Sequence, residues 1–156
     1  MRVRALMAGA VLIWLCPLTA QGQERSNSAD FASRSAVDVA YCMSSAYNLG
    51  LAVAARALGG NKEKFDRALN TYEGDALQSF ADALDDAVEA DAARQENELA
   101  EAQDQFFSLL TAAREWDGQA ATAPGLIEAS RRLGQQLEGI CTELSFSNDE
   151  QLAVAR

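Results

Sequence analysis

Apolar residues recur at steps of three and four through most of this chain, and that spacing constrains the fold more than any other feature. Such steps place side chains on one face of an α-helix. No segment alternates between apolar and polar residues over a useful length, so strands are not expected. The first apolar stripe, within residues 30–58, consists of Ala36, Val39, Met43, Tyr47, Gly50, Ala54 and Leu58.

A second helix is predicted after the Gly59–Gly60 pair, which should end the first helix, and after Asn61, which can cap the next one. Gly74 predicts an interruption of this helix, and Asp75 with Gln78 forms a capping box that would restart it. The apolar face of this region consists of Phe65, Ala68, Leu69, Tyr72, Leu77, Phe80, Leu84 and Val88.

The stripe lapses in residues 89–98, where Asp91 and Gln95 occupy apolar positions. The chain either turns here or continues as one exposed helix, and the sequence leaves both open. A further stripe runs from Leu99 to Trp116, and Pro124 suits the first turn of a last helix. Short connections between amphipathic helices predict an all-α bundle of about four helices in residues 30–146, with residues 147–156 as a C-terminal tail.

Residues 1–22 are typical of a secretory signal peptide. Arg2 and Arg4 precede a short apolar run over residues 5–20, and cleavage could follow Ala20 or Gly22. An uncleaved anchor is the alternative, but the run falls short of the roughly 20 residues that a membrane-spanning helix needs. Residues 23–29 are predicted to be a flexible leader. The expected location of the mature chain is periplasmic or secreted, with no membrane segment.

Charge indicates which partners the chain can bind. The sequence has 13 basic and 23 acidic residues, and loss of Arg2 and Arg4 would leave 11 basic ones. Such a chain repels phosphate backbones and anionic membranes, which argues against nucleic-acid binding. A basic protein partner is favoured.

Ten acidic residues and a single base, Arg94, lie between Asp75 and Asp104. Asp82, Asp86 and Glu89 share a helix face by their spacing. With Asp85 they are the candidate partner-binding residues, although a solvated face that keeps the protein soluble is the alternative. No calcium-binding loop of the EF-hand type contains these acids, so no metal site is expected.

Cysteine usage predicts one disulfide, between Cys42 and Cys141. Cys16 should leave with the signal peptide, and Leu15 before it does not fit a lipoprotein site. In an up-down bundle the first and last helices are antiparallel neighbours, which makes the pairing reasonable. The alternatives are metal ligation or a catalytic thiol, but the chain contains no His to complete either kind of site.

The absence of His removes the commonest general base. The sequence contains no motif for haem, phosphate or dinucleotide binding, so no cofactor and no enzymatic activity are expected. Residues 126–130 are similar to the catalytic-glutamate helix of lytic transglycosylases, which would make Glu128 a general acid. The Gly-rich stretch that follows in that family is missing here, and a first-turn role beside the helix dipole is the alternative.

Two short stretches, Cys42–Tyr47 and Cys141–Leu144, resemble the periplasmic immunity proteins that neutralise type VI secretion amidase effectors. That resemblance implies a small, exported, helical, disulfide-bonded protein that inhibits a toxin. No inhibitory residue is transferred from it.

Three functions follow from these observations. The first is an exported, non-enzymatic helical protein that binds a protein partner, with neutralisation of a toxin or effector as its most concrete form. The second is a structural or apolar-ligand-carrying protein of the cell envelope. The third is a hydrolase that uses carboxylates. The sequence leaves the oligomeric state open, including homo-oligomers.

Overall fold

The fold was obtained as a computed structural model, which describes the backbone of residues 20–154 and the side chains of residues 30–145. It consists of α1 (Ala20–Ala57), α2 (Lys62–Glu89), α3 (Ala93–Glu115) and α4 (Ala123–Val154), with no strand in the described backbone. The predicted all-α bundle of about four helices is confirmed.

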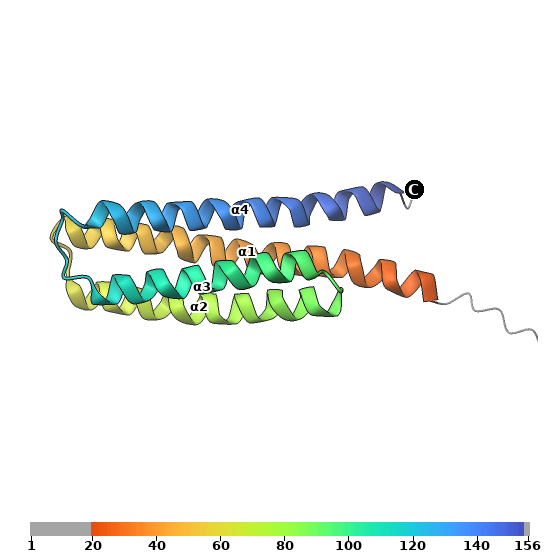
Figure 1. The fold of residues 1–156 in the computed structure, drawn as a ribbon, viewed down its shortest axis with the longest axis horizontal. Coiled ribbons are helices and arrows are strands. Elements are labelled where there is room, and N and C mark those ends of the chain that lie inside the picture. The colour runs from red at the N-terminus through yellow and green to blue at the C-terminus, as the bar shows by residue number, and fades with distance from the viewer. Residues whose placement is uncertain (1–19, 155–156) are drawn as a thin grey trace, which may run out of the picture.

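The helices run up, down, up and down (Figure 1). The α1–α2 and α3–α4 connections lie together at one end, and the α2–α3 turn lies toward the other. α1 packs most extensively against α4 and next against α2, whereas it barely touches α3. α1 and α4 extend beyond the α2–α3 turn as a longer pair. The shorter α2–α3 hairpin therefore packs along part of a longer α1–α4 pair.

The apolar stripes of the four helices meet in one core, as their spacing predicted. Phe80 of α2 and Phe106 of α3 are completely buried, with ring centroids 6.2 Å apart. Three residues that the stripes included, Leu58, Leu77 and Val88, are instead exposed. Leu77 and Val88 lie outside the buried face of α2, and Leu58 follows the end of α1, so the core uses a narrower stripe than the sequence indicated.

α1 and α4 approach closely because small residues face each other. A Cβ added at Gly50 would lie 3.2 Å from Cβ of Ser130, and one added at Gly134 would lie 2.8 Å from the Tyr47 ring. The Tyr47 hydroxyl also donates a hydrogen bond to Oε2 of Glu138 at 3.3 Å. These contacts fix the register of the longest helix pair in the bundle.

Two helices end in the same capping motif with different residues. After α1, Gly59 adopts φ +92°, and the amides of Gly59 and Gly60 donate to the carbonyls of Arg56 and Ala55. This pattern is a Schellman cap with glycine in the left-handed position.

After α2, Asp91 fills that left-handed position at φ +53°. The Asp91 and Ala92 amides donate to the carbonyls of Val88 and Ala87. The chain therefore turns within residues 89–98, which the sequence left open because no glycine marks the site.

α2 continues through Gly74 without the predicted interruption. Glycine inside a helix costs about 1 kcal/mol relative to alanine. Burial of Ala76 and Phe80 directly after it favours continuation of the helix.

The element boundaries differ from the sequence expectations at both ends. The predicted signal peptide lies outside the described residues except for 20–22, which begin α1. Residues 23–29, predicted as a flexible leader, belong to α1, and residues 147–154 of the predicted tail belong to α4. Adding a residue to an existing helix costs far less than starting one, so these polar segments need no apolar stripe to be helical.

The predicted disulfide between Cys42 and Cys141 is wrong, because both cysteines are free thiols. Sγ of Cys141 donates to the carbonyl of Ala36 at 3.0 Å. Ala36 precedes Cys42 by about 9 Å of helix length. A disulfide needs Cα atoms within about 7 Å. α1 and α4 are indeed antiparallel neighbours, but their register separates the two thiols.

We expect the close contact between Tyr47 and Gly134 to be measurable as stability. Gly134→Ala should lower the free energy of unfolding by about 1–2 kcal/mol, because its methyl group meets the Tyr47 ring and overpacking outweighs the gain in helix propensity. Gly139→Ala is the matched control on the same helix, since nothing lies within 4 Å of its added Cβ. It should raise stability by about 0.5–1 kcal/mol. Urea denaturation measures both, and equal effects of the two substitutions would contradict the described α1–α4 register.

Candidate functional site

The four acids predicted to bind a partner lie near the C-terminal end of α2, but they do not all point the same way. Asp82, Asp85 and Glu89 are exposed, whereas Asp86 is half-buried beside α1. Asp82 and Asp86 both lie close enough to Asp38 of α1 to raise its pKa. The structure therefore divides the predicted set into a part that faces α1 and a part that faces solvent.

An ion-pair network joins α1 to α2 at this point. Arg34 of α1 binds Asp30 at 2.9 Å and reaches Asp86 at 3.9 Å. Partial burial raises the pKa of Asp86, the Arg34 guanidinium lowers it, and Glu89, Asp30 and Asp82 raise it. One guanidinium therefore lies among several carboxylates, and repulsion between these carboxylates remains at this part of the α1–α2 interface.

Sequence analysis did not identify Asp38, although its carboxyl belongs to the same cluster. Burial is the largest cause of its raised pKa, followed by the charges of Asp82 and Asp86. No spacing rule within one helix could have found it, because its charged neighbours lie on α2.

The remaining carboxylates of the α2–α3 hairpin point to solvent. Arg94, the single base of this stretch, is engaged by Glu98 at 2.8 Å and by Glu143 of α4 at 2.6 Å. We name the exposed carboxylates of residues 82–104 that have no ion-pair partner among the described side chains the acidic hairpin surface. It consists of Asp82, Asp85, Glu89, Asp91, Glu96, Glu101 and Asp104.

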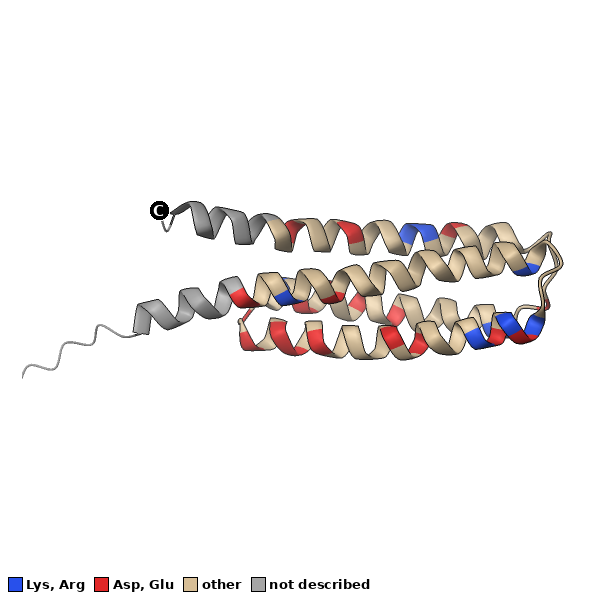
Figure 2. Cartoon of the chain, turned by 180° about the vertical axis from the view of Figure 1, so that it is seen from behind, with Lys and Arg blue, Asp and Glu red and all other residues tan. Residues whose placement is uncertain are grey.

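Basic residues gather at the other end of the bundle. Figure 2 shows blue and red together in the first turns of α2 and red without blue along its remaining length. Most described bases at that end are paired, for example Lys62 with Asp66 at 2.6 Å and Arg114 with Glu73. Lys64 has no ion-pair partner among the described residues. The molecule therefore has an uncompensated acidic end and a nearly balanced opposite end.

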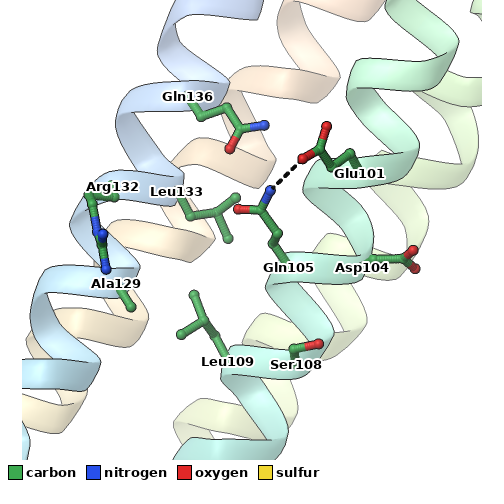
Figure 3. Close-up of a pocket in the computed structure, with 9 residues that line it drawn as sticks. All are labelled: Glu101, Asp104, Gln105, Ser108, Leu109, Ala129, Arg132, Leu133 and Gln136. Carbon is green, nitrogen blue, oxygen red and sulfur yellow. Dashed lines mark hydrogen bonds between the residues drawn. The ribbon is translucent and has the colours of Figure 1, made fainter.

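A groove of about 650 Å³ opens between α3 and α4. Leu109 and Leu133 point into it from the two helices, and Gln105 at its rim donates to Glu101 at 3.4 Å (Figure 3). The lining comprises Glu101, Asp104, Gln105, Ser108, Leu109, Ala129, Arg132, Leu133 and Gln136. Most of these side chains are polar, so the groove is a shallow, mixed surface.

Glu128, the candidate general acid, is held by neighbouring bases. Its carboxylate accepts from Arg131 at 2.6 and 2.9 Å, and Arg132 lies 4.0 Å away. The hydrogen bond from Arg131 is the largest cause of its lowered pKa. A general acid needs a raised pKa to keep its proton near neutral pH, so this environment opposes that role.

The two described thiols are also poorly suited to nucleophilic chemistry. Burial raises the pKa of Cys42 to about 12, with Asp38 adding to the effect and a hydrogen bond with Ser79 acting against it. Burial, then the charge of Glu138, raises the pKa of Cys141. The thiolate is the reactive form, so both cysteines should remain largely unreactive at neutral pH.

Within residues 30–145, no three His, Cys, Asp or Glu side chains are arranged to hold a metal ion. In the same part of the chain, no helix combines the length and apolarity that crossing a membrane requires. Comparisons with known protein families, curated proteins and solved structures found no match to this chain.

We expect Asp38 to destabilise the folded protein near neutral pH. Its pKa is raised on folding, so the folded state binds its proton more tightly than the unfolded state, and stability falls as the pH rises above the ordinary value of 3.8. Asp38→Asn should raise the free energy of unfolding at pH 7 by about 0.4–1 kcal/mol, through removal of two like-charge pairs.

Urea denaturation at several pH values tests this effect. The difference in free energy of unfolding between Asp38→Asn and the unaltered chain should vanish at pH values well below 3.8. There the Asp38 carboxyl is protonated in both the folded and the unfolded state. Asp75→Asn, at an exposed position on α2, serves as the control. A variant at position 38 that is less stable at pH 7 would overturn the electrostatic interpretation.

The thiols give an independent test of the α1–α4 register. Without any reductant, iodoacetamide should alkylate half-buried Cys141 before buried Cys42, and Cys42 should react only after unfolding. Peptide mass spectrometry of time points follows both sites. A peptide pair that contains Cys42 linked to Cys141 would disprove the arrangement.

Proposed function

We propose that this chain is an exported, non-enzymatic binding protein that engages a basic protein partner through the acidic hairpin surface. The observation that carries the proposal is the gathering of unpaired carboxylates from two helices at one end of the bundle. The nearby bases are already occupied, Arg94 by Glu98 and Glu143 and Arg34 by Asp30 and Asp86. Net attraction for a cationic surface therefore remains after the internal ion pairs have formed.

Attraction between the acidic hairpin surface and a basic partner would act mainly on the association rate. A surface of one sign steers an oppositely charged partner and raises the rate of encounter, and salt weakens that effect. All of these carboxylates except Asp91 are carried by helices, so their positions are largely fixed before binding. A rigid, pre-arranged surface loses little conformational entropy on complex formation.

The side chains that the sequence suggested for catalysis favour binding over chemistry. The chain contains no His. The pKa of Glu128 is lowered by Arg131, and the pKa values of Cys42 and Cys141 are raised by burial. These shifts run opposite to those that general acids and nucleophiles need. They weaken the carboxylate-hydrolase alternative.

Toxin or effector neutralisation is the most concrete form of the proposal. Part of the two stretches that resemble amidase immunity proteins lies at the α1–α4 interface, where Cys141 contacts Ala36 and Tyr47 covers Gly134. Their similarity therefore concerns how two helices pack. The acidic hairpin surface lies on other helices, and it is the part of the molecule that we propose contacts the partner.

The alternative is a structural or apolar-ligand-carrying protein of the cell envelope. The α3–α4 groove is the observation that favours it, because Leu109 and Leu133 form an apolar floor. The interior between the four helices is filled by buried side chains such as Phe80 and Phe106. A carried molecule would therefore lie in this groove.

Capture from an envelope extract, with matched variants, tests the proposal. The unaltered chain should retain a basic protein that raised salt releases. Asp85→Asn/Glu89→Gln should weaken the affinity by about threefold to thirtyfold, through loss of two surface charges. Glu63→Gln/Glu115→Gln removes the same charge at the opposite end and should leave the affinity nearly unchanged. Affinity that does not change with salt concentration, or an equal loss of affinity in both double variants, would refute the acidic hairpin surface as the docking site.

A further inference from the structure

One face of α1 is exposed and uncharged, and most of its large side chains are apolar. Every exposed residue of α1 between residues 35 and 57 lies on one stripe, and none of them is charged. The large members are well exposed: Val37 by 55%, Tyr41 by 62% and Leu51 by 67%, with Leu58 directly after the helix at 90%. We name the whole set the α1 outer stripe. It consists of Val37, Tyr41, Ser44, Asn48, Leu51, Ala55 and Leu58.

The spacing of this stripe is the second observation. Its members follow one another at alternating steps of four and three residues over about 32 Å of helix. That is the heptad spacing by which two α-helices pack along their full length. The core of the bundle lies on the opposite side of α1, and among the described residues no member of the stripe belongs to the core cluster or packs against it.

We propose that the α1 outer stripe pairs with the same stripe of a second copy of this chain, in antiparallel orientation about a two-fold axis at Asn48. Such a pairing places Tyr41 opposite Ala55, Val37 opposite Leu58 and Ser44 opposite Leu51. A large side chain then meets a small one in the Tyr41–Ala55 and Ser44–Leu51 pairs, and two apolar side chains meet in the Val37–Leu58 pair. A parallel pairing would instead set Tyr41 against Tyr41 and Ala55 against Ala55, which leaves overpacking at one level and a void at another.

Charge favours a second copy over the basic partner proposed above. The stripe offers no carboxylate to a cationic surface, whereas the acids elsewhere on this chain repel another copy. An uncharged face is where two such molecules can approach with least repulsion. The stripe itself contains no residue of the acidic hairpin surface, so this inference does not rest on the proposed basic partner, and Asp82 on its flank is the residue that the two proposals share.

The flanks of the stripe select the antiparallel orientation. Lys64, which has no ion-pair partner among the described side chains, lies near the start of α2, beside the C-terminal end of α1. Asp82 lies about five helical turns further along α2 and so on the same face. It lies beside Asp38, near the N-terminal end of the stripe. Antiparallel pairing brings Lys64 of each copy to the level of Asp82 in the other, whereas parallel pairing aligns acid with acid.

Leu51→Glu tests the α1 outer stripe as a dimer surface. The Leu51 side chain points to solvent, so its replacement should leave the fold intact. Sedimentation analysis across a concentration series should show a dimer for the unaltered full chain. Leu51→Glu should weaken the dimer by about a hundredfold or more, because each copy would bury an unpaired charge. Leu77→Glu, at a position on α2 that is exposed by 49%, is the control and should leave the dimer unchanged. A monomer at all concentrations, or the same loss in both variants, would overturn the proposal.

Cysteine crosslinking tests the orientation, in a Cys16→Ser/Cys141→Ser background that removes the other accessible thiols. Asn48→Cys should form a disulfide-linked dimer on mild oxidation, because the two copies meet there on the axis. Val37→Cys should not, because its equivalents would lie about 32 Å apart. Mixing Val37→Cys with Leu58→Cys should restore the crosslink. Efficient self-crosslinking at position 37 would overturn the antiparallel arrangement.

Discussion

The close packing of α1 against α4 is the constraint on which the rest of this structure depends. Gly50 lies against Ser130, and Gly134 leaves room for the Tyr47 ring, so the two longest helices can approach closely. That contact sets the register of the pair, which in turn places Cys141 beside the carbonyl of Ala36. The register therefore keeps the two cysteines apart, with the Cys141 thiol hydrogen-bonded to a backbone carbonyl and the Cys42 thiol buried. The α2–α3 hairpin packs along the remaining side of this pair.

The hairpin gathers like charges on its surface. α2 and α3 each carry many acids, and the turn at Asp91 folds them into one region where Arg94 compensates only part of the charge. At the α1–α2 contact, Arg34 offsets the carboxylates around Asp86, yet burial and neighbouring charges still raise the pKa of Asp38 and Asp86. This arrangement costs stability, as like charges held together do. A cationic partner would relieve part of that cost on binding.

Two surfaces of contrasting chemistry therefore lie on one small bundle. The acidic hairpin surface attracts positive charge and is sensitive to salt, whereas the α1 outer stripe is uncharged and has the spacing of a helix-packing seam. Because they occupy different faces, both could be used at once. A two-fold pairing through α1 would then present two acidic hairpin surfaces on one particle, and a partner with two basic sites would bind it with increased avidity.

The sequence by itself determined the helices, since three- and four-residue apolar spacing admits no other regular structure, and it determined the acidic character of residues 75–104. It indicated a turn at Gly59–Gly60 because glycine adopts a left-handed backbone at little cost. It could not indicate the turn at Asp91, where a residue other than glycine takes that conformation. Only the tertiary structure decided which acids face α1, that Asp38 joins them, and that Cys42 and Cys141 remain apart. Those outcomes depend on the register between helices, which spacing within one helix does not encode.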